Sequence, residues 1–242
     1  MPNLYSNNDD GYITSSTDAT WAGARDDTSG TVNAAGTVAS SFTAAARFAG
    51  RGGGSTYRVV RSFMYFDTSG ITGTVSAATI KIHGYVYKDG SVIAVKSDAC
   101  GGDGGTALAS TDLNNIVGYS TGSSLAGNAT DYSNAITGSS WSTSGYNDLT
   151  GTSDLRADMQ NNNVVIICFM DYTNDYLNSA VGSASYLNYG AYMTDYTGTS
   201  RDPYIEYTIA TGYANNVNGV AAASIGKING VATASIEKVN GI

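Results

Sequence analysis

The sequence predicts an all-β protein, an antiparallel jelly-roll β-sandwich followed by a short C-terminal β-hairpin or extended repeat arm. The chain of 242 residues has 30 glycines and 18 tyrosines but 2 prolines, and 13% of its residues are charged. Tyrosine and β-branched residues fit pleated surfaces, and glycine and asparagine fit tight turns. Short apolar stretches alternate with long polar connections, without a strand–helix–strand rhythm. We therefore expect one sandwich domain over residues 1–210 and a repeat tail over 211–242.

Two stretches in the first half of the chain show the patterns of strands. Tyr57–Asp67 has apolar side chains at both odd and even positions, which predicts a central strand with at least one face fully buried. In Thr79–Tyr87 the apolar residues Ile80, Ile82 and Val86 alternate with lysine, histidine and tyrosine. This alternation predicts one face on the core and one face toward water or a partner.

The segments after this strand predict a hairpin and then long connections. Asp89–Gly90 has the composition of a two-residue hairpin turn leading into the strand Ser91–Lys96. The polar stretch 101–163 contains two short helical patches, Ala109–Val117 and Ser153–Gln160. We expect these patches to lie on connections that cross between the two sheets.

The remaining strands of the domain are predicted in its last third. Val164–Asp171 is the most continuous apolar run in the chain, which favours a strand buried on both faces. Tyr186–Tyr196 and Tyr204–Ile209 follow, and Pro203 suits the start of the latter because no ladder donor is lost there.

The charge and the termini exclude several classes of partner. The net charge is −8, with 12 Lys and Arg against 20 Asp and Glu, so we expect no nucleic-acid partner. No stretch approaches the roughly 20 apolar residues of a membrane span, and the first residues do not resemble a secretion signal. Cys100 lies in a glycine-rich turn and Cys168 in an apolar run. A loop thiol and a buried small hydrophobe are favoured, and a bridge between them stays open.

The residues of catalytic chemistry are few, and we expect no enzymatic activity. His83 is the only histidine, and its place in a strand favours a surface residue over a catalytic base. Asp171 and Asp175 are the least implausible carboxylate pair for glycoside hydrolysis, but solvated loop carboxylates are the expectation. The glycine run in Ala49–Arg58 lacks the Lys-Ser/Thr of a phosphate-binding loop and predicts a flexible turn.

No cofactor is predicted apart from weak candidates for a structural calcium site. None of the candidate aspartates has the ligand spacing of an EF-hand, so turn-forming roles are favoured. The candidates form three pairs: Asp9 with Asp10, Asp98 with Asp103, and Asp171 with Asp175.

Tyrosines on the polar faces of predicted strands are the candidate binding residues. A tyrosine ring can stack on a sugar or fill a subunit interface, and the sequence does not separate the two uses. Core and strand-pairing roles are alternatives for some of these tyrosines. The candidates for glycan or subunit contact are Tyr85, Tyr87, Tyr189 and Tyr192, with Tyr186 and Tyr196 in the same stretch.

The chain ends in an eleven-residue repeat, which is typical of stacked or tiled units. Its copies are Val217–Lys227, Ile228–Lys238 and the partial copy Val239–Ile242. Each contains Asn-Gly, so we expect Ala223–Ile228 and Val231–Ile236 to form a hairpin. A helix is less favoured because glycine costs about 1 kcal/mol relative to alanine in a helix interior, and a disordered tail is the other alternative.

The apolar residues of the repeat are predicted to make assembly contacts. A two-stranded hairpin is marginal in water, so its side chains must pack on the sandwich or on another subunit. These residues are Val217, Val220, Ile225, Ile228, Val231, Ile236 and Val239.

Several stretches resemble a known module. RSFMYFDTSGITGTVSAATIKIHGYVY, Arg61–Tyr87, is similar to the core of DNRLRE-type β-sandwich modules. Arg201–Ile209 resembles their closing strand, and Asp10–Ile13 fits their opening. Such modules occur beside polysaccharide-degrading enzymes as carbohydrate-binding units and in structural proteins of tailed bacteriophages. The likeness covers roughly residues 8–210, and the KINGVA-type repeat is similar to tails of phage virion proteins.

These resemblances imply a non-enzymatic virion structural protein of a tailed phage. Head decoration, tail fibre and tail-associated component are the alternatives for its position. Its expected partners are copies of itself, other virion proteins and a host-surface polysaccharide, and it is expected in the virion after assembly in the host cytoplasm. The alternative function is a carbohydrate-binding module that recognises a polysaccharide. A polysaccharide-degrading enzyme is the third class, for which no activity is expected.

Overall fold

The computed structural model describes residues 1–7, 10–34, 38–50, 52–183, 185–194, 198–210, 226–228 and 231–232. The strands are β1 (Asn3–Tyr5), β2 (Gly11–Ser15), β3 (Gly30–Asn33), β4 (Val38–Ala49), β5 (Ser55–Asp67), β6 (Val75–Lys88), β7 (Ser91–Lys96), β8 (Ile136–Thr137), β9 (Tyr146–Thr150), β10 (Val164–Met170), β11 (Ser185–Tyr192), β12 (Tyr204–Ile209), β13 (Lys227–Ile228) and β14 (Val231–Ala232). The helices are α1 (Trp21–Arg25) and α2 (Ser153–Asn161), with single turns η1 (Cys100–Gly102), η2 (Ser110–Asn114), η3 (Gly138–Ser140) and η4 (Tyr172–Tyr176). The predicted all-β class is confirmed.

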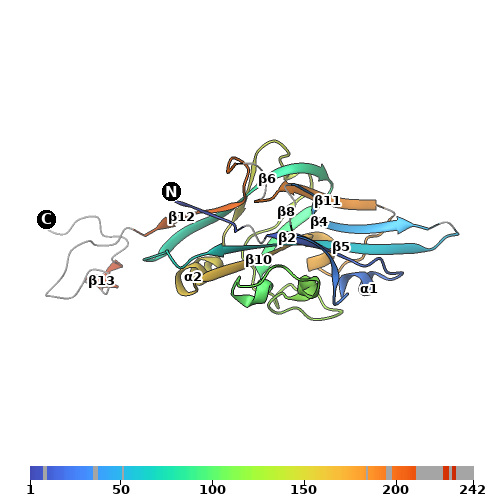
Figure 1. The fold of residues 1–242 in the computed structure, drawn as a ribbon, viewed down its shortest axis with the longest axis horizontal. Coiled ribbons are helices and arrows are strands. Elements are labelled where there is room, and N and C mark those ends of the chain that lie inside the picture. The colour runs from blue at the N-terminus through green and yellow to red at the C-terminus, as the bar shows by residue number, and fades with distance from the viewer. Residues whose placement is uncertain are drawn as a thin grey trace.

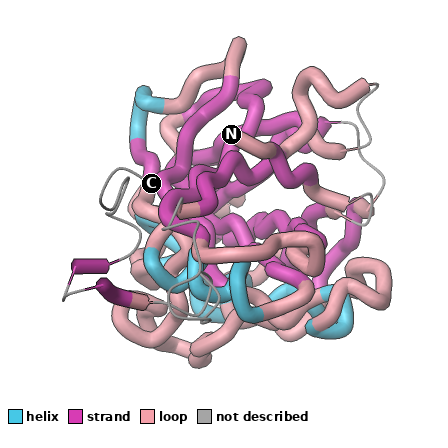
Figure 2. The backbone as a smooth tube through the Cα atoms, turned by 90° about the vertical axis from the view of Figure 1, so that its left-hand side faces the viewer, coloured by secondary structure: helices cyan, strands magenta, loops and turns pink. Residues whose placement is uncertain are grey.

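The main sheet has twelve strands and curls on itself (Figures 1 and 2). Its order is β1-β12-β6-β11-β4-β5-β10-β7-β8, with β2 paired to β3 and β5 and with β9 paired to β6. The neighbouring strands of this sheet pair in antiparallel orientation. The two longest strands exchange partners along their length: β5 pairs with β4, then β2 and β10, and β6 pairs with β12 and β9, then β11. The jelly-roll connectivity stays a prediction.

Strand β10 separates two apolar clusters, as its continuous apolar sequence predicts. Ile167 and Phe169 point into the cluster inside the curl, with Phe42 and Ile80 among their neighbours. The alternate residues of β10, among them Cys168, point into a second cluster beneath the long connection that contains η1 and η2. Burying an aliphatic or aromatic side chain of this size stabilises the fold by about 1.5–3 kcal/mol, so a strand that is buried on both faces anchors both layers.

The predicted hairpin at Asp89–Gly90 is wrong. β6 pairs with β9, β11 and β12, whereas β7 pairs with β8 and β10. Asp89 has a positive φ of 47° and bridges Asn188, and a Cβ on Gly90 would lie 2.5 Å from the Asn188 carbonyl carbon. The Asp-Gly pair therefore turns the chain from one side of the curled sheet to the other, where the backbone approach leaves room only for glycine.

A bulge in β6 changes the predicted alternation. Gly84 pairs with Ala191 and Val86 pairs with Gly190, so Tyr85 is an extra residue between them. Because one extra residue reverses the facing of the side chains that follow, Tyr87 packs against the core while Tyr85 is exposed. The prediction that these two tyrosines share the outer face is wrong.

The described part of the repeat tail forms a separate two-stranded sheet. Lys227 pairs with Ala232 and Ile228 pairs with Val231, in antiparallel register. This is the pairing that the sequence predicts around Asn229-Gly230, although the turn residues themselves lie outside the described residues. The other predicted tail contacts also lie outside them: Val217, Val220, Ile225, Ile236 and Val239.

Both cysteines are buried, and no disulfide bridge joins Cys100 to Cys168. The helical patch 109–117 is the short turn η2, and the second patch is α2, which Thr152 caps by accepting a hydrogen bond from the Leu155 amide at 3.3 Å. Across the described ranges, no helix has both the length and the apolar character needed to cross a membrane.

Candidate binding surfaces

Five tyrosines and one histidine form a continuous row on the outer face of the curled sheet, which we call the aromatic ladder. The residues come from five strands that are far apart in sequence, because the sheet brings β1, β12, β9, β6 and β11 together. Successive ring centroids lie 5.5, 5.0, 5.1, 5.1 and 5.5 Å apart. In order, the ladder is Tyr5, Tyr204, Tyr146, His83, Tyr192 and Tyr85.

Strand alternation places the ladder opposite the core. Ile205, which follows Tyr204, and Ile82, which precedes His83, are fully buried. Tyr5 and Tyr85, at the two ends of the ladder, are 41% and 46% exposed, and the rings between them are half-buried. Most neighbouring rings meet edge to face, an arrangement that aromatic quadrupoles favour and that holds the rings in place.

Polar groups border the ladder between Tyr146 and Tyr192. The Arg201 guanidinium carbon lies 4.5 Å from the Tyr192 ring centroid, and an Arg201 N–H donates to the Tyr192 hydroxyl. The Tyr146 hydroxyl donates to the Ser200 and Asp202 carbonyl oxygens at 3.1 and 3.2 Å. Burial and the charge of Arg201 lower the pKa of His83, although the Gly84 carbonyl acts against them. The imidazole is therefore neutral at pH 7.

The lysine beside the ladder is already paired. Lys81 Nζ lies 2.6 Å from Asp148 Oδ2 and 3.7 Å from Glu206 Oε2. A cation that is balanced by two carboxylates offers little attraction to an anionic ligand. The ladder therefore presents neutral rings with a border of mixed charge.

Two of the four predicted binding tyrosines, Tyr85 and Tyr192, belong to the ladder. Tyr189 is instead fully buried, so the prediction that it is exposed is wrong. Its ring stacks on Trp141 with centroids 4.5 Å apart, and its hydroxyl donates to the Gly138 carbonyl at 2.6 Å. Tyr87 lies against Tyr189, and its hydroxyl donates to Asp89 Oδ1 at 2.7 Å.

The sequence does not single out the other ladder residues as binding residues. Tyr204 alternates with Ile205 and Ile209 in its strand, and this pattern predicts that it lies on the outer face. Tyr5 and Tyr146 lie in segments without a clear strand pattern. Their place in the ladder depends on the pairing of β1 with β12 and of β9 with β6, which joins residues far apart in sequence. Of the two other tyrosines in the predicted stretch, Tyr186 packs against Phe48 and Tyr196 lies outside the described residues.

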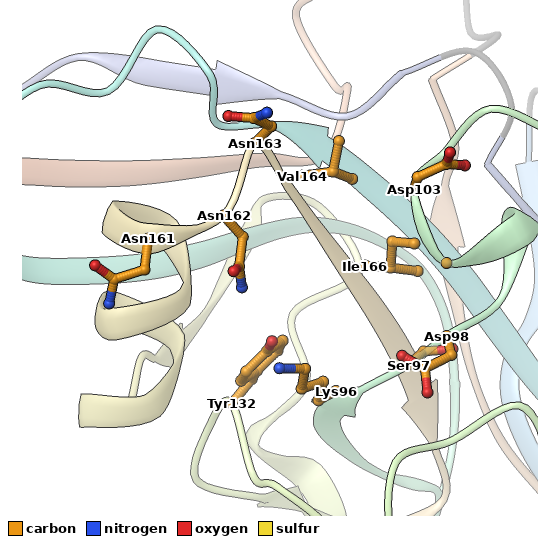
Figure 3. A pocket seen from close by; sticks show the side chains of 11 residues that line it. Lys96, Ser97, Asp98, Asp103, Tyr132, Asn161, Asn162, Asn163, Val164 and Ile166 are labelled. Carbon is orange, nitrogen blue, oxygen red and sulfur yellow. The ribbon is translucent and has the colours of Figure 1, made fainter.

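A polar cleft of about 630 Å³ lies between the end of α2, the end of β7, the start of β10 and the loop after η1 (Figure 3). Two apolar side chains of β10 lie among polar groups from α2, β7, the loop after η1 and the segment that contains Tyr132. The cleft is lined by Lys96, Ser97, Asp98, Gly102, Asp103, Tyr132, Asn161, Asn162, Asn163, Val164 and Ile166.

Asp158 holds three of the lining side chains in place. Its carboxylate lies 3.0 Å from Lys96 Nζ and accepts from the Tyr132 hydroxyl at 2.5 Å and from Asn162 Nδ2 at 3.0 Å. Burial acts to raise the pKa of Asp158, but the hydrogen bonds and the Lys96 charge outweigh it and lower the pKa. The cleft wall is therefore an ordered, charged network at neutral pH.

Asp175 is the centre of a buried charge cluster and not a solvated loop carboxylate as predicted. Arg61 donates to both of its carboxylate oxygens at 2.7 Å, and Arg25 Nε donates to its backbone carbonyl at 2.8 Å. Both arginines, like Asp175, have no exposed surface, and their guanidinium carbons lie 5.1 and 5.2 Å from the Tyr119 ring centroid. Burial raises the pKa of Tyr119 to about 12. The Asp175 carboxylate is therefore inaccessible to a substrate.

Asp171 is buried too, and its carboxylate organises the turn η4. It accepts from Ser91 Oγ at 2.6 Å and from the Asn174 amide at 2.7 Å. Burial raises its pKa to about 6, although these hydrogen bonds favour the carboxylate and act in the opposite direction. The prediction of a solvated pair at 171 and 175 is therefore wrong for both residues.

The raised pKa of Asp171 predicts a pH dependence of stability. The folded chain binds this proton more tightly than the unfolded chain, where the pKa is about 3.8. The resulting stabilisation is fully present below about pH 4 and is lost as the pH rises through about 6. We expect Asp171→Asn to remove a change of about 3 kcal/mol in the free energy of unfolding across this range, measured by urea titration at several pH values. Exposed Asp89→Asn is the control, and an unchanged slope in Asp171→Asn would contradict the prediction.

The aspartate pairs predicted as calcium candidates lie in different settings. Asp10 Oδ2 accepts from the Thr194 hydroxyl at 2.6 Å, whereas Asp9 lies outside the described residues. Asp98 and Asp103 both line the polar cleft. In the part of the chain that the structure describes, no three His, Cys, Asp or Glu side chains gather as metal ligands would.

Comparison of the chain with protein-family models and with curated proteins finds no match. Function is therefore inferred from the sequence and from the geometry of the ladder, the cleft and the tail.

Proposed function

We propose that the protein is a non-enzymatic structural component of a tailed-phage virion. It serves as a head decoration protein, a tail fibre or a tail-associated component. The eleven-residue repeat and the resemblance of its motif to phage virion tails support this proposal. The observation that carries it is the antiparallel pair β13–β14 at the predicted place in the repeat. Strands of two residues are too short to be stable by themselves. Pairing with another subunit supplies the missing backbone hydrogen bonds, and the alternating Val and Ile side chains supply the register.

Subunit assembly through the tail predicts an effect of a charge in β14. Val231 is 51% exposed. A charged side chain at this position would remove the stabilisation gained by burying Val231 at a subunit contact. We expect Val231→Asp in the full chain to weaken self-association at least about tenfold, measured by mass photometry over a dilution series. Thr121→Asp, which adds the same charge at an exposed site on the sandwich, is the control. Identical oligomer distributions in the two variants would count against assembly through the tail.

A second candidate function is polysaccharide recognition, which the aromatic ladder favours. The C–H faces of sugar rings pack on aromatic rings, and their hydroxyls need donors and acceptors at the edge. The ladder offers rings at a nearly constant spacing, with the Arg201 guanidinium at its border. Recognition of a host-surface polysaccharide is compatible with the virion proposal, since a structural subunit can carry an attachment surface.

This candidate predicts a specific role for the most exposed ring of the ladder. Tyr85→Ala is expected to weaken glycan binding by about 0.5–1.5 kcal/mol, the range for one aromatic contact. The full chain is screened on an array of neutral and acidic polysaccharides, and the best ligand is then titrated by calorimetry. Tyr87→Phe is the matched control, because its ring faces the core. Equal affinities in Tyr85→Ala and the wild type would reject the ladder as the contact.

A further inference from the structure

The polar cleft has the features of a second ligand site, which shares no residue with the aromatic ladder. We propose that it binds one neutral sugar unit through hydrogen bonds to its hydroxyl groups. A cleft of about 630 Å³ falls within the range of about 300–1,000 Å³ for small-ligand sites. The inference does not depend on the virion assignment.

The floor and walls of the cleft match the two kinds of surface on a sugar. Val164 and Ile166 are alternate residues of β10 and supply an aliphatic floor (Figure 3). The walls come from separate segments: Asn162 and Asn163 after α2 on one side, and Asp98 after β7 on another. A ligand with apolar C–H groups and several hydroxyls can satisfy both surfaces at once.

The wall groups have hydrogen-bonding capacity to spare. Asn162 Nδ2 donates to Asp158, which leaves the Asn162 Oδ1 as an acceptor and fixes the orientation of this amide. Lys96 Nζ has three donors and contacts the same carboxylate, so further donors are available. The exposed side chains of Asn163 and Asp98 add an amide, which both donates and accepts, and a carboxylate, which accepts. Adjacent sugar hydroxyls need this mixture of donors and acceptors.

The charge of the cleft argues against an anionic ligand. Lys96 is the one cation among the lining residues, against the carboxylates of Asp98 and Asp103, and it is already paired with Asp158. The chain as a whole carries −8. A phosphate or a uronic acid would meet this surplus of negative charge with one neutralised lysine to hold it.

A cationic ligand fits the surface less well than a neutral sugar. The Asp158 carboxylate, which contacts three of the lining side chains, is already balanced by Lys96 and two hydrogen bonds. The rest of the lining mixes the Asp98 and Asp103 carboxylates with amides, the Lys96 ammonium group and an aliphatic floor, so it offers donors as well as acceptors. A neutral polyhydroxylated ring uses the donors as well as the acceptors.

The test is a titration of the full chain with a panel of neutral hexoses, one amino sugar and one uronic acid, followed by saturation-transfer NMR. A neutral hexose is expected to bind, and Asp98→Ala and Asn163→Ala are each expected to weaken its binding about tenfold. Tyr85→Ala in the ladder is expected to leave this binding unchanged, which separates the cleft from the ladder. Thermal unfolding of each variant confirms that it is folded, and Asn161→Ala replaces a variant that is not.

Three results would overturn the proposal. The first is that no hexose binds to the wild-type chain. The second is that a hexose binds equally well to Asp98→Ala and Asn163→Ala, or is lost in Tyr85→Ala, which would place it on the ladder. The third is that the uronic acid or the amino sugar displaces the neutral hexose, which would assign the cleft to a charged ligand.

Discussion

Replacing Arg61 by methionine is expected to lower the free energy of unfolding by about 3–5 kcal/mol, because it leaves a buried carboxylate without its partner. Arg61 donates two hydrogen bonds to Asp175, one to the Leu113 carbonyl at 2.8 Å and one to the Arg25 carbonyl at 3.0 Å. Burial acts to lower the pKa of Arg61, but the charge and hydrogen bonds of Asp175 outweigh burial and raise the pKa of Arg61. Urea unfolding followed by tryptophan fluorescence measures the loss.

Two further variants make this prediction specific. The double variant Arg61→Met/Asp175→Leu removes both charges, so it should recover much of the stability lost in Arg61→Met. Arg156→Met is the control, because Arg156 is half-buried and makes a hydrogen bond to the Gly151 carbonyl without a buried ion pair. A loss in Arg61→Met no larger than in the control would show that the cluster contributes little.

Gly84→Ala is expected to destabilise the protein by about 3 kcal/mol or more, at the upper end of the range for overpacking. A Cβ at this position would lie 1.8 Å from the Ser142 carbonyl oxygen and 2.9 Å from Trp141 Nε1. The first of these atoms belongs to the backbone and cannot rotate away. The pair Ser142 and Trp141 would have to move as a unit, and Trp141 belongs to the main core cluster.

Gly70→Ala is the matched control for this substitution. Gly70 is exposed, and a Cβ there would meet nothing within 4 Å. Thermal and urea unfolding of both variants should therefore separate a clash from a general effect of the alanine. Equal stability of Gly84→Ala and Gly70→Ala would show that the segment after Trp141 yields without cost. Gly84 also lies between His83 and Tyr85, so the same variant is expected to disturb the ladder.

The features of the fold that local periodicity determines were predicted correctly. β5 and β10 have apolar residues on both faces, and both strands are buried in the centre of the sheet. The prediction of a hairpin at Asp89–Gly90 was wrong because an Asp-Gly pair specifies a turn but does not specify which strands pair after it. Here the next strand pairs with β10 instead, and the close approach of Asn188 to Gly90 explains the glycine.

The binding surface was predictable only in part, because it depends on pairings between distant segments. A single extra residue, Tyr85, turns Tyr87 toward the core, and no local pattern marks this bulge. Asp175 lies in a polar stretch of sequence that is typical of a loop, but its partner Arg61 lies 114 residues away in sequence. Such a contact becomes visible only when β5 and the turn η4 are placed side by side.

The exchange of partners along β5 and β6 has a consequence for how the chain folds. β5 and β6 each pair with different strands at their two ends, so they join separate parts of the curled sheet. No part of the sheet can therefore form completely before the others. Pairings such as β1 with β12 also join segments about as far apart as the domain allows. A topology with such high contact order folds slowly, and its parts are expected to melt together in a single cooperative transition.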